Sequence, residues 1–171
     1  MNIAILTAAA PFALDPGRAL TQQLTDLLRR RGADAEVIRI PAASPPTERR
    51  IDDMVICRSL GLSNVDRVIA LRFPAYLVAH PCKVCWLFEP WHAEAAADAS
   101  RKTDTPRERE IERLIAASDG ECLRAAHRLF AGSSAVRARL KARNGLDCEV
   151  LVPPPLGSST AWDAALDKLL S

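Results

Sequence analysis

Short, mostly apolar runs alternate with helix-like segments along the chain. The runs that we expect to form strands are residues 2–7, 35–40, 66–73, 84–88, 128–131 and 148–152. Apolar runs of this length are typical of strands buried on both faces of a parallel sheet. We therefore predict an α/β fold, Rossmann-like and doubly wound, with a mostly parallel sheet and helices on both faces.

Helix signals lie between these runs. Leucines spaced i, i+4, i+7 and i+8 share one face of a helix over residues 20–28. Asp15 and Pro16 before it predict an N-cap followed by proline at the first helical position, and Gly32 predicts the end of the helix. A second helix is expected over residues 47–60.

Three more helices are expected in the second half of the chain. Thr105 with Glu108 three positions later forms a capping-box pattern, which predicts a helix start. Another helix is expected to open around Ser133 and to end at Gly145. After a proline run, apolar residues at positions 162–170 are spaced i, i+3, i+4, i+7 and i+8, which predicts a C-terminal amphipathic helix.

This last helix sets the expected domain organisation. We predict that residues 1–156 form one domain and that residues 157–171 form a linker and the C-terminal helix. The apolar face of such a helix needs a partner surface. We therefore expect it to pack back on the domain or to lie at an oligomer interface.

Composition narrows the class of protein. The 171 residues suit one globular domain, and 49% hydrophobic with 26% charged residues argues against disorder. A net charge of +2 excludes a strong global attraction for nucleic acid. No apolar run approaches the length of a membrane span, and residues 1–7 resemble a strand more than a signal peptide. Together with five scattered cysteines, an odd number, this predicts a cytoplasmic location.

Ligands of doubly wound sheets bind at the carboxyl ends of the strands. Arg72 and Tyr76 follow the third expected strand, so both are candidates to line a crevice there. The alternative is that Arg72 is solvated and Tyr76 packs against the next element.

The segment after the fourth expected strand carries the best candidates for catalysis. Glu89 and His92 combine a carboxylate with an imidazole at a strand end, where they are able to act as general acid and base. Trp91 beside them offers a surface on which a sugar ring or a base stacks. The alternative is an ordinary polar loop with one buried tryptophan. The whole of residues 89–105 is expected to be a long loop.

Anion sites are the third possibility at this edge. Neither the glycine-rich dinucleotide fingerprint nor a P-loop pattern occurs in the chain. Gly17 and Arg18 nevertheless lie at an expected helix start, where backbone N–H groups attract anions. Ser133 lies at another, although an N-cap without a ligand is the commoner explanation of such a serine.

The sequence offers little support for metal or disulfide chemistry. Cys82 and Cys85 form a C-x-x-C pattern, but it leads directly into a strand, so their side chains are expected on opposite faces. His80 and His127 lie apart from any second ligand pair and are expected to be structural or solvated. We predict no metal site.

Three segments share their patterns with a known family. Residues 66–87, DRVIALRFPAYLVAHPCKVCWL, match the pattern DxVIAxKFPAYLVxHPNKVVWLL, and residues 125–136 and 144–155 match ARRVFANSxxV and NGLxAEVLYPPP. These patterns belong to the amino-terminal domain of GT-B glycosyltransferases, and of family 4 in particular. The chain resembles that domain over residues 1–156.

The resemblance implies the acceptor half of a two-domain enzyme that transfers a sugar from a nucleotide-sugar to an acceptor without a metal. By position in the family, Glu89 or His92 lies nearest the reacting centre, Gly17 lets the backbone approach the donor phosphates, and Arg72 balances phosphate charge. The remaining residues that the resemblance places along the crevice are Arg18, Tyr76, Trp91 and Ser133. The donor-binding domain with its pair of glutamates is expected to be missing from this chain. No cofactor is expected, and a nucleotide-sugar donor is expected for the complete enzyme.

The chain departs from the family where the family touches its ligands. The paired glycines after the first strand become Asp15–Arg18, and the histidine-rich end of the fourth strand becomes Glu89–His92. A second interpretation is therefore a non-catalytic sugar-binding protein, or one subunit of a two-chain transferase whose partner is a separate donor-domain chain or a second copy. A third is an unrelated Rossmann-like binding module, which leaves the long central match unexplained.

Overall fold

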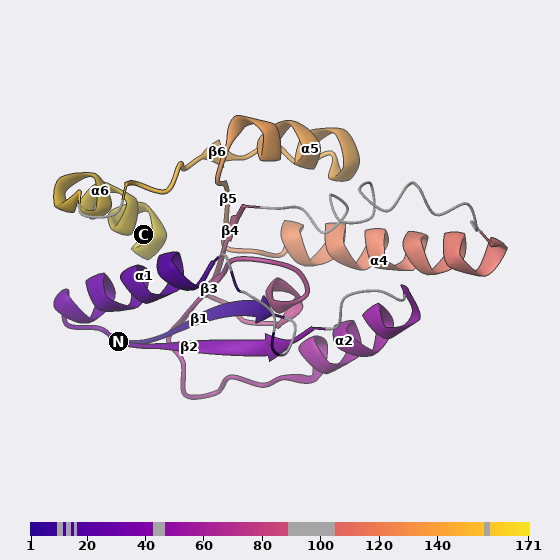
Figure 1. Ribbon diagram of the computed structural model, residues 1–171, viewed down its shortest axis with the longest axis horizontal. Helices are drawn as coiled ribbons and strands as arrows, with labels where there is room; N and C mark the ends of the chain where they lie inside the picture. The colour runs from indigo at the N-terminus through magenta and orange to yellow at the C-terminus, as the bar shows by residue number, and fades with distance from the viewer. Residues whose placement is uncertain (10–11, 13–14, 16, 43–46, 89–104, 156–157) are drawn as a thin grey trace.

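The computed structural model describes residues 1–9, 12, 15, 17–42, 47–88, 105–155 and 158–171. The strands of this described part are β1 (Asn2–Ala9), β2 (Asp34–Pro41), β3 (Arg67–Ala70), β4 (Lys83–Leu87), β5 (Arg128–Ala131) and β6 (Glu149–Val150). Its helices are α1 (Arg18–Arg30), α2 (Thr47–Ser59), the short 3-10 helix η1 (Ala75–Leu77), α4 (Pro106–Arg124), α5 (Ser134–Asn144) and α6 (Ser159–Leu170). Figure 1 shows the sheet running through the middle of the molecule with helices on either side of it.

The strands form one six-stranded sheet in the order β2-β1-β3-β4-β5-β6, and every neighbouring pair is parallel. The chain first steps outward from β1 to β2 and then returns to place β3 on the other side of β1. This reversal defines a switch point between β1 and β3. The predicted α/β, Rossmann-like, doubly wound fold is confirmed.

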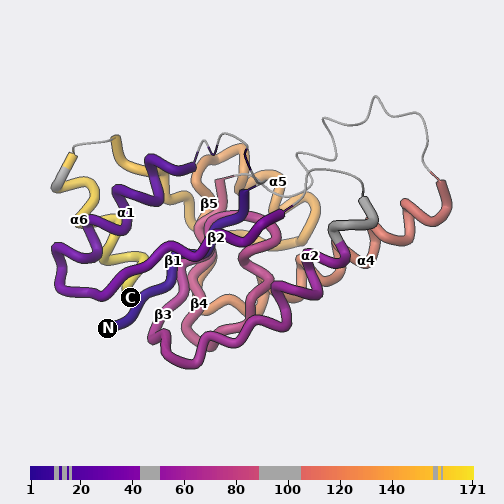
Figure 2. Tube along the Cα trace, turned by 60° about the horizontal axis from the view of Figure 1, so that its bottom comes forward, coloured from indigo at the N-terminus to yellow at the C-terminus, as the bar shows by residue number. Residues whose placement is uncertain are grey.

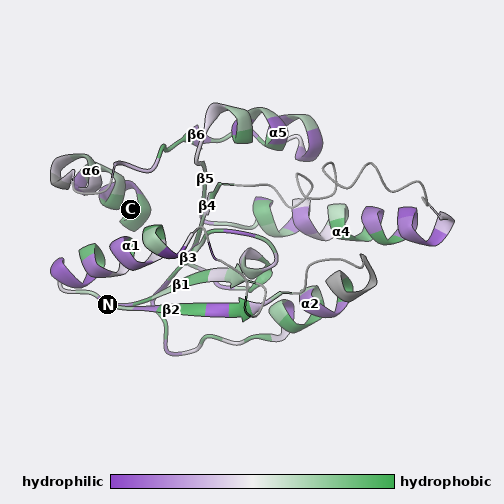
Figure 3. Cartoon of the chain, in the orientation of Figure 1, coloured by the Kyte–Doolittle hydropathy of each residue, from purple (hydrophilic) through white to green (hydrophobic). Residues whose placement is uncertain are grey.

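Two layers of helices cover the two faces of the sheet. Alternate residues of β1 face opposite cores, Ile3 and Ile5 on one side and Ala4 and Leu6 on the other. Helices α1 and α6 cover the first face, which we call the α1/α6 layer. Helices α2, α4 and α5 cover the second, the α2/α4/α5 layer. Figure 2 shows this division from a second direction, and Figure 3 shows alternating green and purple bands along α4.

The start of α1 differs from the prediction. Gly17, not Asp15, is the N-cap residue, and the predicted first helical position, Pro16, lies outside the described residues. The Asp15 carboxylate accepts a hydrogen bond from the backbone N–H of Gly17, two positions on, over 2.9 Å. This local bond competes with helix capping, and the helix therefore begins later than the sequence pattern indicates.

Other helix ends follow the predicted signals. Thr105 and Glu108 form the expected capping box at the start of α4. Ser133 caps α5 through a bond from the N–H of Val136, and Gly145 ends that helix in the left-handed conformation with φ of 65°. These motifs are confirmed because their partners lie within four residues of each other along the chain.

Two strands are shorter than predicted. β3 ends at Ala70 instead of continuing to residue 73, because Pro74 and the turn of η1 carry the chain away from the sheet. β6 comprises only Glu149 and Val150. It lies at the edge of the sheet with β5 as its one neighbour, and the proline run that starts at Pro153 ends it.

Helix α6 lies on the domain itself. Trp162, Leu166 and Leu169 are at most 1% exposed, and they belong to the same apolar core as α1. The ring of Trp162 meets that of Trp86 edge-on, with 6.2 Å between ring centroids. On the outer side, Arg31 at the end of α1 forms ion pairs with Asp163 and Asp167. Helix α6 therefore packs on the domain of its own chain, and its part in an oligomer interface stays a prediction.

Candidate functional site

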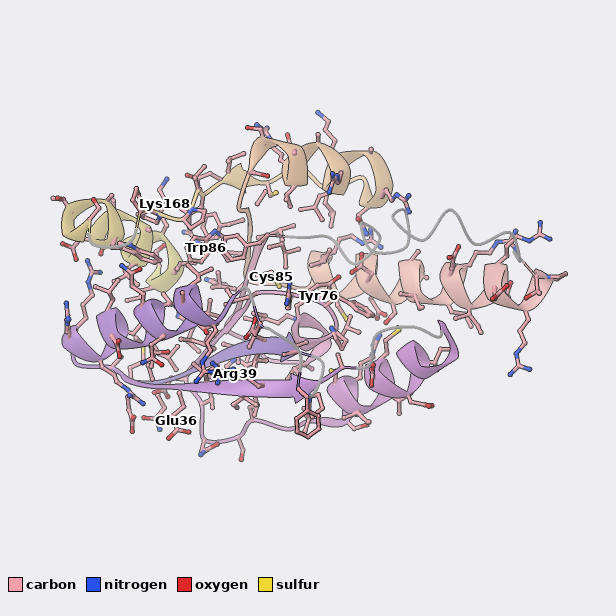
Figure 4. All side chains as sticks on the ribbon, in the orientation of Figure 1. Glu36, Arg39, Tyr76, Cys85, Trp86 and Lys168 are labelled. Carbon is pink, nitrogen blue, oxygen red and sulfur yellow. The ribbon has the colours of Figure 1, made fainter. Side chains whose placement is uncertain are left out.

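The candidate site lies at the carboxyl ends of the strands, at the switch point between β1 and β3. Ligands of open α/β sheets bind in the crevice at this point. Three charged side chains meet here: Asp15 from the segment after β1, Arg39 from the end of β2, and Arg72 from the segment after β3. We call them the switch-point cluster. Figure 4 labels Arg39 on its strand.

Asp15 holds the centre of the switch-point cluster. Its side chain is 9% exposed, and its Oδ1 atom accepts the N–H of Gly17. The Nη1 atom of Arg72 lies 3.9 Å from Oδ1, and the Nε atom of Arg39 lies 3.8 Å from Oδ2. Both separations exceed hydrogen-bond length, and Oδ2 is buried without a hydrogen-bond partner. One carboxylate therefore attracts two guanidinium groups without binding either tightly.

Among the described residues, the cluster brings two positive charges together with one negative charge. Two arginines face one aspartate, and the first turn of α1 beside them carries no acidic residue. Arg18, exposed at the start of α1, adds a further positive charge. The positive end of the α1 dipole lies in the same place. Chemically, the arrangement suits an anion with several oxygen atoms, because guanidinium groups and helix N-termini both donate to such groups.

Arg72 is anchored to the sheet as well as to Asp15. Its Nη1 atom donates to the backbone oxygen of Ala8 at the end of β1 over 3.5 Å, and its side chain is 25% exposed. A guanidinium carries five N–H donors in a fixed plane. The structure therefore places Arg72 at the predicted edge with part of its surface open to solvent.

Tyr76 lies in the core instead of on the surface of the crevice. It is 1% exposed, and its hydroxyl donates to the carboxylate of Asp119. Burial, together with the negative charge of Asp119, holds the pKa of the Tyr76 hydroxyl well above its usual value. Asn144 donates to the other oxygen of Asp119 over 2.8 Å. Of the two interpretations of Tyr76, packing against a neighbouring element is the one that the structure shows. The side chain presents almost no surface to a ligand.

Ser133 has a clear structural role. Its side-chain oxygen accepts the N–H of Val136 over 3.2 Å at the start of α5. The preceding residue, Gly132, lies so close to the ring of Phe88 that a Cβ atom at this position would overlap with it. Ser133 thus lies at the carboxyl ends of the strands, as predicted, and serves there as the N-cap of α5. Its contact with an anion stays a prediction.

The predicted catalytic residues Glu89 and His92, and the stacking residue Trp91, lie outside the described residues. Their roles stay predictions. The described chain reaches Phe88 at the carboxyl edge and resumes at Thr105, the N-cap of α4.

The cysteine pair shows no sign of an activated thiol. Cys85 is fully buried on β4, and burial raises the pKa of its thiol to about 12. A thiol with so high a pKa is a poor nucleophile and a poor metal ligand. His80 is structural, since one ring nitrogen lies 3.0 Å from the oxygen of Val65 and the other accepts the N–H of Cys82. Among the described residues no group of three metal-ligating side chains occurs.

Sequence reasoning missed two members of the switch-point cluster. The pattern around Asp15 predicts only a helix cap, and the pattern around Arg39 predicts only a strand. Arg39 carried a usable signal, since it is the charged residue within residues 37–40 and comes directly before the last buried residue of β2. Its register partner on β1 is Thr7, which marks it as close to the carboxyl edge.

Comparison with known proteins adds no family assignment. No protein-family model matches the chain, and no curated protein matches it with significant similarity. Within the described residues, no helix combines the length and apolar character needed to cross a membrane.

Proposed function

We propose that this chain is the acceptor-side half of a sugar-nucleotide-dependent glycosyltransferase of the GT-B type, similar to family 4. The observation that carries the proposal is the pair Arg39 and Arg72 at the switch point, beside the start of α1. A sugar nucleotide brings a diphosphate, whose oxygens suit two guanidinium groups and a helix N-terminus. The resemblance of residues 66–87 to the family supports the same assignment.

The proposed roles follow from position. Arg72 and Arg18 balance the charge of the donor phosphates, and Gly17 lets the backbone come close to them. Glu89 or His92 serves as the general base for the acceptor hydroxyl. The reaction then breaks the bond between the sugar and the diphosphate and forms one between the sugar and the acceptor oxygen.

A specific observation favours a second candidate, a non-catalytic sugar-binding chain or one subunit of a two-chain transferase. The Asp15 carboxylate occupies the N–H of Gly17 and lies between the two arginines. The carboxylate of Asp15 therefore occupies the position proposed for a donor phosphate, and it supplies a negative charge there. In a chain that does not bind a donor by itself, such a contact stabilises the segment after β1.

The test is binding and turnover of UDP-glucose, UDP-N-acetylglucosamine and GDP-mannose by the whole chain, measured by calorimetry and by release of the nucleoside diphosphate. We expect Arg72→Gln to weaken binding about 10-fold to 100-fold, the range for losing a hydrogen bond to a charged group. Arg139→Gln on α5 makes the same charge change at an exposed position and should leave affinity unchanged. Equal affinity in Arg72→Gln and the parent chain would contradict the assigned role.

Asp15→Asn separates the two candidates. The amide oxygen still accepts from Gly17, but the negative charge is gone, so sugar-nucleotide affinity should rise. Turnover by the parent chain supports the transferase, whereas binding without turnover supports the second candidate. Binding to Asp15→Asn but not to the parent chain also supports the second candidate, and absence of binding to both chains argues against the transferase.

A further inference from the structure

A second site lies at the opposite edge of the sheet. A cavity of about 480 Å³ opens beside Lys83, the first residue of β4, between the ends of α2 and α4. This volume falls within the range of small-molecule sites. Its walls include the apolar side chains of Leu77, Pro81 and Ala125. The cavity lies at the amino ends of the strands and shares no residue with the switch-point cluster.

Lys83 brings an unneutralised charge to this cavity. The residue is 3% exposed, and its ammonium donates to the backbone oxygens of Tyr76 and Val78 over 2.8 and 3.0 Å. None of the ion pairs that the described residues form within 4.0 Å includes Lys83. An ammonium has three N–H donors, so the two carbonyls hold it in place and leave one donor over. A buried cation without a counter-ion is costly, and an anion in the cavity would remove that cost.

The rim of the cavity carries one ion pair. The Nη1 atom of Arg58 donates to Ser118 over 2.8 Å and to Glu121 over 3.2 Å. Both charged side chains are largely exposed, at 45% and 68%. The positive and negative charges at the rim therefore cancel, and the excess at the cavity is the single charge of Lys83.

The other polar side chains of the lining are those of His80 and Cys122. Both ring nitrogens of His80 are engaged, one beside the oxygen of Val65 and the other with the N–H of Cys82. Burial raises the pKa of the Cys122 thiol above its usual value, so this group carries no charge at neutral pH. Among the residues that line the cavity, apolar walls are thus combined with one net positive charge, while the carboxylate of Asp119 lies outside the lining.

We propose that this cavity binds a small organic monocarboxylate, with its carboxylate on Lys83 and its apolar body against Leu77, Pro81 and Ala125. One available ammonium donor matches one carboxylate. A phosphate dianion requires several donors, and the rim, where Arg58 and Glu121 form an ion pair, offers no second positive charge for it. A neutral apolar molecule would leave the charge of Lys83 without a partner.

The probes are hexanoate, hexan-1-ol and inorganic phosphate, titrated into the whole chain by calorimetry and by NMR of the backbone amides of residues 79, 80, 82, 83 and 121–125. We expect hexanoate to bind at least tenfold more tightly than either of the other two. Equal affinity for hexan-1-ol would show an apolar cavity without anion recognition. Equal affinity for phosphate would show a general anion site. Either result overturns the proposal, as does hexanoate binding that is too weak to detect at millimolar concentration.

Four variants locate the binding. Lys83→Gln should abolish the preference for hexanoate over hexan-1-ol. Ala125→Leu narrows the cavity at an exposed position and should lower hexanoate affinity at least tenfold, a result that stays informative if Lys83→Gln fails to fold. Glu121→Gln removes the partner of Arg58, which leaves a second positive charge at the rim, and should raise affinity for hexanoate severalfold. Arg139→Gln, at an exposed position outside the lining of the cavity, serves as the charge-matched control. Unchanged affinity in Ala125→Leu overturns the proposal, whatever sugar nucleotides do at the opposite edge.

Discussion

The two helical layers cover opposite faces of one sheet but bury different kinds of side chain. The α1/α6 layer packs large apolar side chains, with the rings of Trp86 and Trp162 in edge-on contact. The α2/α4/α5 layer buries the charged side chains of Lys83 and Asp119 and the hydroxyl of Tyr76, and it carries the cavity. A buried polar group requires matched partners, whereas an apolar contact does not. The first layer therefore stabilises the sheet mainly through apolar contacts, whereas the second adds a buried polar network to its own apolar core.

The largest effect should come from the α1/α6 layer. Trp162→Ala removes the largest side chain that α6 buries, together with its bond from Nε1 to the oxygen of Pro155. We expect the free energy of unfolding to fall by about 3–5 kcal/mol, the range for deleting a buried aromatic side chain. Urea denaturation followed by circular dichroism measures it.

The control for this prediction is Leu114→Ala on α4. Leu114 is 54% exposed, and such a change usually alters stability by no more than about 0.5 kcal/mol. If Trp162→Ala unfolds like Leu114→Ala, α6 does not belong to the cooperative unit and the first layer is not the stabilising one.

A smaller effect should come from the polar network of the second layer. Tyr76→Phe keeps the ring but removes the hydroxyl that donates to Asp119. The buried carboxylate then loses a donor and keeps that of Asn144, so we expect a loss of about 1–3 kcal/mol. Ser59→Ala removes one hydroxyl at an exposed helix end and should cost less. Equal losses in the two variants would mean that the network adds no stability beyond an ordinary surface bond.

The same contrast explains what the sequence could predict. The apolar runs around Ile5 and Trp86 correctly predicted two of the strands, because a strand that is buried on both faces has a continuous apolar sequence. The capping box of Thr105 was readable because its partner is three residues away. The bond between Tyr76 and Asp119 spans 43 positions, and no local pattern encodes a contact at that distance.

The candidate site was predictable only in part, for a related reason. Gly17 and Arg72 were expected at the carboxyl edge, because a parallel sheet brings the ends of its strands together. The role of Asp15 depends on two arginines that arrive from different strands, so only the assembled sheet shows it. Lys83 was hidden at the start of a strand, where a charged residue normally faces solvent.

The smallest effect should appear at the surface of the second layer, where Arg137 on α5 pairs with Asp147. The hydrogen bonds from Arg137 hold the pKa of Asp147 below its usual value. A carboxyl whose pKa is lower in the folded chain adds stability above its unfolded pKa, and that stability is lost as the pH falls through the folded pKa. Arg137→Gln should therefore raise the pKa of Asp147 towards the ordinary value, whereas Arg139→Gln, two residues further along α5, should leave it low. An NMR titration of the carboxyl carbon measures both variants. An unchanged pKa in Arg137→Gln would mean that solvent already screens the pair, and that the layer depends on its buried network alone.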